Sequence, residues 1–178
     1  LKMFTDIPLN EIERVKETFE IIIDRYPYYQ SLNEKLLEDS KKSDYPSNFS
    51  YEDNYKFYAK HSDFNTSSKS IDIINSWVIN VLRIKYPDLI ELKCAASWFA
   101  LYNRGDWVAC HDHIPNLYSY VYFVDSPKGS SPLIFSTSGK RIKAEKGKVV
   151  IFPASMIHHV PVNKCDGRVT LAGNFKSG

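Results

Sequence analysis

The sequence has no long apolar run, no concentration of one charge and few cysteines. None of its apolar runs approaches the ~18 residues that a membrane-spanning helix needs, and the opening LKMFTDIPLN lacks the apolar core of a signal peptide. Its 23 Lys and Arg residues are interleaved with 21 Asp and Glu residues, so they form no basic stripe suited to nucleic acid. We therefore expect a cytoplasmic protein that binds neither membranes nor nucleic acids.

The few cysteines are odd in number and scattered, which does not suggest a disulfide framework, so Cys94, Cys110 and Cys165 are expected to be reduced thiols. The chain also lacks internal repeats, low-complexity tracts and a linker long enough to separate two domains. Its 178 residues fit one domain of ~100 to 200 residues, and an apolar content of 43% is enough for a sizeable core. We therefore predict a single domain over residues 1–178.

The hydrophobic period changes near residue 90. Before it, helical spacing predicts helices over 10–23, 28–42 and 70–87, while the polar segment 43–68 is expected to be a loop. After it come eight short β-rich runs separated by Gly, Pro, Ser and Asn: 93–102, 106–111, 118–125, 132–137, 140–145, 147–153, 156–162 and 168–175. The pattern predicts an α+β protein, mainly β, in which the helical region 1–90 packs on an antiparallel sandwich or barrel over 91–178.

Two histidines lie one residue apart in NRGDWVACHDHIPNLYSYVYFV, residues 103–124. Residues two apart on a strand project to the same face, so His111 and His113 can converge on one metal ion while Asp112 points elsewhere. Histidines on a β face also serve ordinary hydrogen bonding, which leaves both interpretations open. The later segment GKVVIFPASMIHHVPVNKCDGRVTLAGNF is more specific, because His158 follows a strand that ends in Phe-Pro and Arg168 stands ten residues beyond it.

With these motifs, residues 95–175 resemble the Fe(II)- and 2-oxoglutarate-dependent oxygenases of the type common in marine phages and bacteria. The resemblance runs through Tyr102 and RGD, then HDH, SYVYFV, GKVVIFP, His158 and RVTLAGN. It implies a double-stranded β-helix (jelly-roll or cupin-like) core. It also implies an enzyme that uses Fe(II), 2-oxoglutarate and O2 to hydroxylate a C–H bond of a small-molecule or peptide substrate, releasing succinate and CO2. A phage-encoded protein of this kind would work in the host cytoplasm.

The resemblance also assigns roles to individual residues. It implies that His111, His113 and His158 bind the iron and that Arg168 binds the far carboxylate of 2-oxoglutarate. Imidazole suits Fe(II), and a guanidinium can hold a carboxylate through two parallel hydrogen bonds, so the chemistry accepts these roles. Thr170 lies on the Arg168 face of its strand and can donate a further hydrogen bond, and Tyr102 is another candidate for the same carboxylate.

Several alternatives stay open at this stage. The wider oxygenase superfamily usually has His-x-Asp/Glu, so Asp112 is the rival of His113 as a ligand. His159 is expected to lie behind the site or at the surface, and His61 to be solvated in its loop. Cys110 and Cys165 also permit a zinc site, although no CxxC pair supports it. Four aromatic residues either pack the barrel or line its pocket, namely Tyr120, Tyr122, Trp98 and Trp107.

Two other functions compete with the oxygenase. Gly105 is followed by five residues and then His-x-His, which matches the opening of a cupin motif and permits a three-His dioxygenase without 2-oxoglutarate, although the downstream Glu of that motif is absent. The second competing function is that of a non-catalytic jelly-roll protein, which is structural or binds a partner. Neither of these functions requires Arg168, so this residue separates them from the oxygenase.

Overall fold

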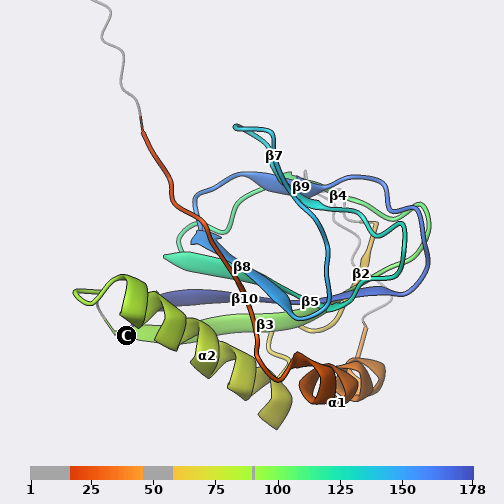
Figure 1. The fold of residues 1–178 in the computed structure, drawn as a ribbon, viewed down its shortest axis with the longest axis horizontal. Coiled ribbons are helices and arrows are strands. Elements are labelled where there is room, and N and C mark those ends of the chain that lie inside the picture. Colours follow the sequence, from red (N-terminus) through yellow and green to blue (C-terminus); the bar gives the residue numbers. More distant parts are fainter. Residues whose placement is uncertain (1–16, 46–57, 90) are drawn as a thin grey trace, which may run out of the picture.

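The computed structural model describes residues 17–45, 58–89 and 91–178. It is mainly β, with two antiparallel sheets and two helices in these residues (Figure 1). The helices are α1 (Tyr29–Lys42) and α2 (Lys69–Lys85), and the strands in chain order are β1 (Ile22–Arg25), β2 (Lys60–His61), β3 (Leu92–Tyr102), β4 (Val108–His111), β5 (Tyr118–Asp125), β6 (Leu133–Phe135), β7 (Lys140–Ile142), β8 (Lys148–Pro153), β9 (His158–Val160) and β10 (Arg168–Ser177).

Two sheets form the body of the fold. The larger has the strand order β1-β8-β5-β10-β3-β2 and the smaller has the order β4-β9-β6-β7. From β3 to β10 the chain crosses repeatedly between them, and the helices lie on the outer face of the larger sheet, opposite the smaller one (Figure 1). This arrangement is a jelly roll, as expected, and all eight β-rich runs after residue 90 contain one of its strands.

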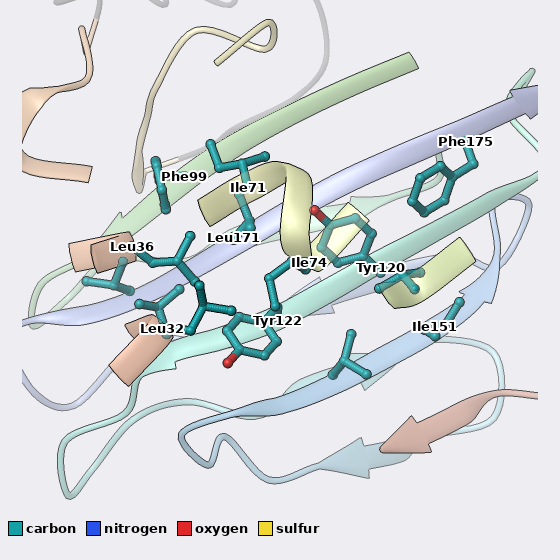
Figure 2. Close-up of a cluster of buried hydrophobic side chains, with 14 of the residues drawn as sticks. Leu32, Leu36, Ile71, Ile74, Phe99, Tyr120, Tyr122, Ile151, Leu171 and Phe175 are labelled. Atoms are coloured by element: carbon teal, nitrogen blue, oxygen red, sulfur yellow. The ribbon is translucent and has the colours of Figure 1, made fainter. Parts of the chain in front are cut away.

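The larger sheet is apolar on both faces because each face covers a different core. On β5, Tyr120, Tyr122 and Val124 face the helices, whereas Phe123 faces the smaller sheet. The helix side forms the larger cluster, where helical side chains such as Ile74 pack against the tyrosines (Figure 2). The pocket interpretation of the two tyrosines is therefore wrong, and their packing role is confirmed.

Polar side chains anchor the helices to this face. Asn33 of α1 accepts a hydrogen bond from the Tyr122 hydroxyl at 2.7 Å and donates one to the Val124 carbonyl at 2.6 Å. Asn75 of α2 accepts one from the Tyr120 hydroxyl at 2.8 Å. Buried polar groups are costly unless they are paired, so these bonds fix how the helices sit on the sheet.

The N-terminal region departs from its prediction in two places. The loop expected over 43–68 contains the short strand β2, which pairs with β3. The helix expected over 10–23 lies partly outside the described residues, and its described end is not helical: 17–21 have no regular structure and β1 pairs with β8, Ile22 opposite Ile151. Consecutive β-branched isoleucines favour a strand where a sheet edge is available, and here β8 offers one. The helices at 29–42 and 69–85 are confirmed. Neither is long and apolar enough to cross a membrane.

A candidate metal and carboxylate site

Three histidines converge between the two sheets. His111 ends β4 and stands opposite His158, which begins β9, while His113 follows in the turn after β4. One ring nitrogen of each lies within 4.8 Å of the others, and the ring centroids are 4.4 to 5.0 Å apart. The predicted convergence of His111, His113 and His158 is therefore present in the structure.

Backbone carbonyls orient two of these rings. Nδ1 of His111 lies 2.8 Å from the Ala109 carbonyl oxygen, and Nδ1 of His158 lies 2.8 Å from that of Met156. A carbonyl oxygen can only accept a hydrogen bond, so Nδ1 is the protonated nitrogen of each neutral ring. The lone pair then resides on Nε2, the arrangement that second-sphere carbonyls impose on metal-binding histidines.

Burial keeps the three rings neutral. Desolvation, together with the neighbouring imidazoles, lowers the pKa of His113 and of His158 to about 3. Desolvation also lowers the pKa of His111, although its bond to Ala109 opposes the shift. Unprotonated imidazole is the form that binds a metal, so the site is prepared for one at neutral pH.

Asp112 does not join the cluster. Its side chain is exposed, and its Oδ1 accepts a hydrogen bond from the Ile114 amide at 3.1 Å. Although β4 ends at His111, both His111 and His113 belong to the cluster, whereas Asp112 between them is exposed. The geometry therefore favours His113 over Asp112 as the third ligand.

Arg168, the first residue of β10, is fully buried at the other end of the same space. Its Nε donates to the Ser131 carbonyl at 3.1 Å, and its Cζ lies 4.1 Å above the centre of the Tyr102 ring. In the described residues Nη1 and Nη2 have no partner within hydrogen-bond distance and angle, and the Tyr102 ring lies against the guanidinium. Burial lowers the pKa of Arg168, but a guanidinium stays charged in proteins. A buried cation with two free donors is therefore suited to an anion.

A cavity of about 400 Å³ joins the histidines to Arg168. Its floor consists of facing residues of β3 and β10, with Tyr102 opposite Arg168 and Ala100 opposite Thr170. Tyr102 and Thr170, both predicted to lie at the carboxylate end, line it together with Arg168. The walls near this end are apolar and include Val108, Val121, Leu133 and Val160.

The structure adds residues that the sequence did not indicate. His61 is 8% exposed and lines the cavity, so the prediction of a solvated side chain is wrong. It belongs to β2, which pairs with β3, and burial lowers its pKa to about 4. Phe64 also lines the cavity. So does Trp98, for which the sequence left packing and pocket lining open, and it is at the same time largely buried. A polar loop sequence gives no sign that its chain returns to a sheet edge, so His61 could not have been found from the sequence.

The remaining candidates lie elsewhere. His159 points away from the triad, and its Nδ1 is 2.8 Å from the Ser136 hydroxyl and 3.7 Å from the Cys110 sulfur. Cys165 is buried against Asn163 and Ser130, near Arg168, and neither thiol belongs to a metal-ligand cluster among the described residues. The zinc interpretation is therefore not supported. Trp107 stacks on Tyr58 at 4.7 Å outside the cavity lining.

This fold and this pair of binding elements, three imidazoles and a buried guanidinium, define a jelly roll with a candidate metal and anion site. Comparison with known proteins by sequence finds no matching family model and no matching curated protein. Among solved structures, the chain is similar to the viral collagen prolyl hydroxylase of Paramecium bursaria Chlorella virus-1 in its 2OG complex. The TM-score is 0.71 at 14% identity, over 91% of this chain and 97% of that chain.

Two further structures show the same likeness. One is a Pseudomonas putida prolyl-4-hydroxylase, with a TM-score of 0.64 and 15% identity over 90% of this chain and 94% of that chain. The other is HygX from Streptomyces hygroscopicus with nickel and 2-oxoglutarate bound, with a TM-score of 0.65 and 9% identity over 90% and 84% of the two chains. At such identities the likeness shows the fold alone.

Proposed function

We propose that the protein is an Fe(II)- and 2-oxoglutarate-dependent oxygenase that hydroxylates a C–H bond of its substrate. The observation that carries this proposal is the buried guanidinium of Arg168, whose two free nitrogens share one cavity with the three-histidine cluster. A metal explains the histidines and an anion explains the arginine. A 2-oxo acid with a second carboxylate explains both at once, because it can chelate the metal and reach the guanidinium.

The donor set fits this pair of ligands. Neutral imidazoles suit Fe(II), and three of them leave positions for a chelating 2-oxo acid and O2. They also leave the metal with its full charge of +2, which the 2-oxoglutarate dianion offsets. The same imidazoles suit other divalent metals, so the case for iron rests on the cosubstrate as well as on the ligands.

The residues of the chain then have distinct roles. His111, His113 and His158 would hold the metal, and Nη1 and Nη2 of Arg168 would donate two parallel hydrogen bonds to the far carboxylate. The hydroxyl of Thr170, which lines the cavity near Arg168, can donate a third. The bound iron would supply the oxidation, in which O2 and 2-oxoglutarate are consumed and the hydroxylated product, succinate and CO2 are released. The apolar walls exclude water from this reaction.

The competing functions leave Arg168 unexplained. A cupin-like three-His dioxygenase needs the histidines alone, and a non-catalytic jelly roll needs neither group. The substrate stays open between peptides and small molecules. The similar structures include prolyl hydroxylases and HygX, which has also been crystallised with hygromycin B. A kinship with the phage type of these enzymes and a cytoplasmic location stay predictions.

The test is an anaerobic titration of the protein with Fe(II) and then with 2-oxoglutarate, followed through the visible charge-transfer band of the chelate. We expect stoichiometric metal binding and a saturable band. Pyruvate, which keeps the 2-oxo acid but lacks the far carboxylate, is the matched control and should bind far more weakly. Equal affinity for the two acids, or O2 consumption without 2-oxoglutarate, would favour the cupin-like enzyme.

A further inference from the structure

The cavity continues past the histidines, away from Arg168. After the pairs Arg168–Tyr102 and Thr170–Ala100, the floor goes on with Ala172 opposite Trp98 and Asn174 opposite Ala96. The seven residues from Arg168 to Asn174 span on the order of 20 Å of strand. The Trp98 ring lies 5.8 Å from the ring of His113, so the Asn174 pair is one step beyond the cluster. This end, far from the 2-oxoglutarate position, is where a substrate has room.

Asn174 offers an unused hydrogen-bond donor at this end. The residue is 8% exposed, and its Oδ1 accepts a hydrogen bond from the Ser119 hydroxyl at 2.8 Å. Its Nδ2 makes no hydrogen bond within the part of the chain that the structure describes. Since the side chain lines the cavity and its oxygen is engaged, the amide nitrogen is available to a carbonyl oxygen of a ligand.

Aromatic rings form the wall beside this donor. Phe64 and Trp98 meet edge to face with their ring centroids 5.0 Å apart, and His61 lies against Phe64 at 6.3 Å. Ala96 and Ala172 lie next to Trp98 on the floor, where small side chains leave space. Flat rings beside small residues accept an apolar group such as an aliphatic ring or chain.

This end of the cavity also carries little charge. Among the described residues that line the whole cavity, Asp112 and Arg168 are the formally charged ones, and Asp112 is exposed at the rim. Arg168 lies at the opposite end. A charged substrate group would therefore be desolvated here without a counter-charge.

We propose that Phe64, Trp98 and Asn174 select the substrate of this enzyme, and that they bind an uncharged amide. Its apolar part would pack on the aromatic pair, and its carbonyl oxygen would accept a hydrogen bond from Nδ2 of Asn174. The inference rests on the proposed function, since it names the substrate class of that site. The amide can belong to a peptide or to a small amide, and the experiment separates these sources.

The test measures binding to the anaerobic Fe(II)–2-oxoglutarate complex by isothermal titration calorimetry. The probes are N-acetyl amino-acid N-methylamides with proline, valine, lysine or glutamate at the centre, and pentapeptides that carry the same residues at their middle position. We expect the proline and valine probes to bind and the lysine and glutamate probes to bind at least about tenfold more weakly. Binding by the pentapeptides alone would identify a peptide as the source, and equal binding by the single amides would identify a small molecule.

The deciding variant is Asn174→Asp, which keeps an oxygen for Ser119 and replaces the Nδ2 donor by an acceptor. The variant should bind the neutral probes on the order of tenfold more weakly and the lysine probe more tightly, and its affinity for 2-oxoglutarate should be unchanged. Asn80→Asp, on the exposed face of α2, is the matched control and should change none of these. Unchanged selectivity in Asn174→Asp, or no binding by any neutral probe while the complex with 2-oxoglutarate forms, would overturn this inference alone. Failure to form that complex would overturn the proposed function with it.

Discussion

Arg168→Met should separate the affinity for 2-oxoglutarate from the stability of the fold. Methionine fills most of the buried volume but removes the charge and both free donors. In the ligand-free protein each unsatisfied buried donor costs about 1–3 kcal/mol, and this cost disappears in the variant. Against it stand the lost hydrogen bond to Ser131, about 1 kcal/mol, and the lost stacking on Tyr102, about 0.5–2 kcal/mol. The free energy of unfolding of the ligand-free variant should therefore equal or exceed that of the parent.

Bound 2-oxoglutarate should make the parent more stable than the variant. Losing the partner of a buried carboxylate costs about 2–5 kcal/mol of binding, so the dissociation constant of 2-oxoglutarate should rise on the order of 30-fold to several thousandfold. At 100 times the parent's dissociation constant, 2-oxoglutarate should stabilise the parent by about 2.7 kcal/mol and the variant by about 0.9 kcal/mol or less. Arg168→Lys should recover only part of the affinity, because an ammonium replaces a two-pronged donor.

The assay is urea denaturation of the metal-loaded protein under anaerobic conditions, with and without 2-oxoglutarate, beside a direct titration of the cosubstrate. The control is Arg141→Met, which removes an exposed arginine from β7 and should alter neither quantity. The reasoning is refuted if Arg168→Met binds 2-oxoglutarate as tightly as the parent. It is also refuted if the ligand-free variant loses several kcal/mol of stability, because Arg168 would then be a structural cation.

Three further predictions concern the histidines and Tyr102. His158→Ala should abolish stoichiometric metal binding, and with it the charge-transfer band, whereas His159→Ala should keep both; metal analysis after dialysis decides. Because the pKa is lowered to about 3 for His113 and to about 4 for His61, the unfolded chain binds more protons than the folded one below pH 6.5. The free energy of unfolding of the metal-free protein should therefore fall by about 1.4 kcal/mol per pH unit for each of these imidazoles between pH 6.5 and about 4. Constant stability in denaturation experiments at pH 7, 6 and 5 would contradict this. Tyr102→Phe should leave 2-oxoglutarate affinity within about threefold, because the ring face makes the contact with Arg168, whereas Tyr102→Leu should weaken it by more.

The pH prediction shows what the structure adds to a motif. From the ordinary histidine pKa of about 6.5, metal binding would be expected to fail below about pH 6. The structure places His113 and His158 where desolvation holds the pKa of each near 3, so protons compete with the metal only at lower pH. Sequence spacing identifies which side chains share a face, but their burial depends on what the rest of the chain places over them.

The same difference explains which parts of the fold could be predicted. The strands after residue 90 and the helices at 29–42 and 69–85 were predictable because their hydrophobic period reflects the face that each element buries. The segment Ile21–Ile23 satisfies helical and extended patterns equally, and its pairing with a distant strand decided the outcome. The prediction that His61 is solvated failed for a related reason, since its burial depends on a two-residue pairing with β3 that leaves no pattern in the sequence.

The two faces of the larger sheet differ in how their buried polar groups are satisfied, and this difference locates the ligands. On the helix face, Asn33 and Asn75 have both amide atoms bonded to tyrosines, backbone or Ser97. On the opposite face, Arg168 accounts for two of the three buried side-chain atoms without a partner in the described residues. Asn174 adds a further donor there that makes no bond within those residues. A fold that pairs its polar groups so completely on one face has no structural need for unpaired donors on the other. Two ligands, a cosubstrate with an anionic carboxylate at the Arg168 end and a substrate with an amide carbonyl at the Asn174 end, would supply the partners that the chain itself does not.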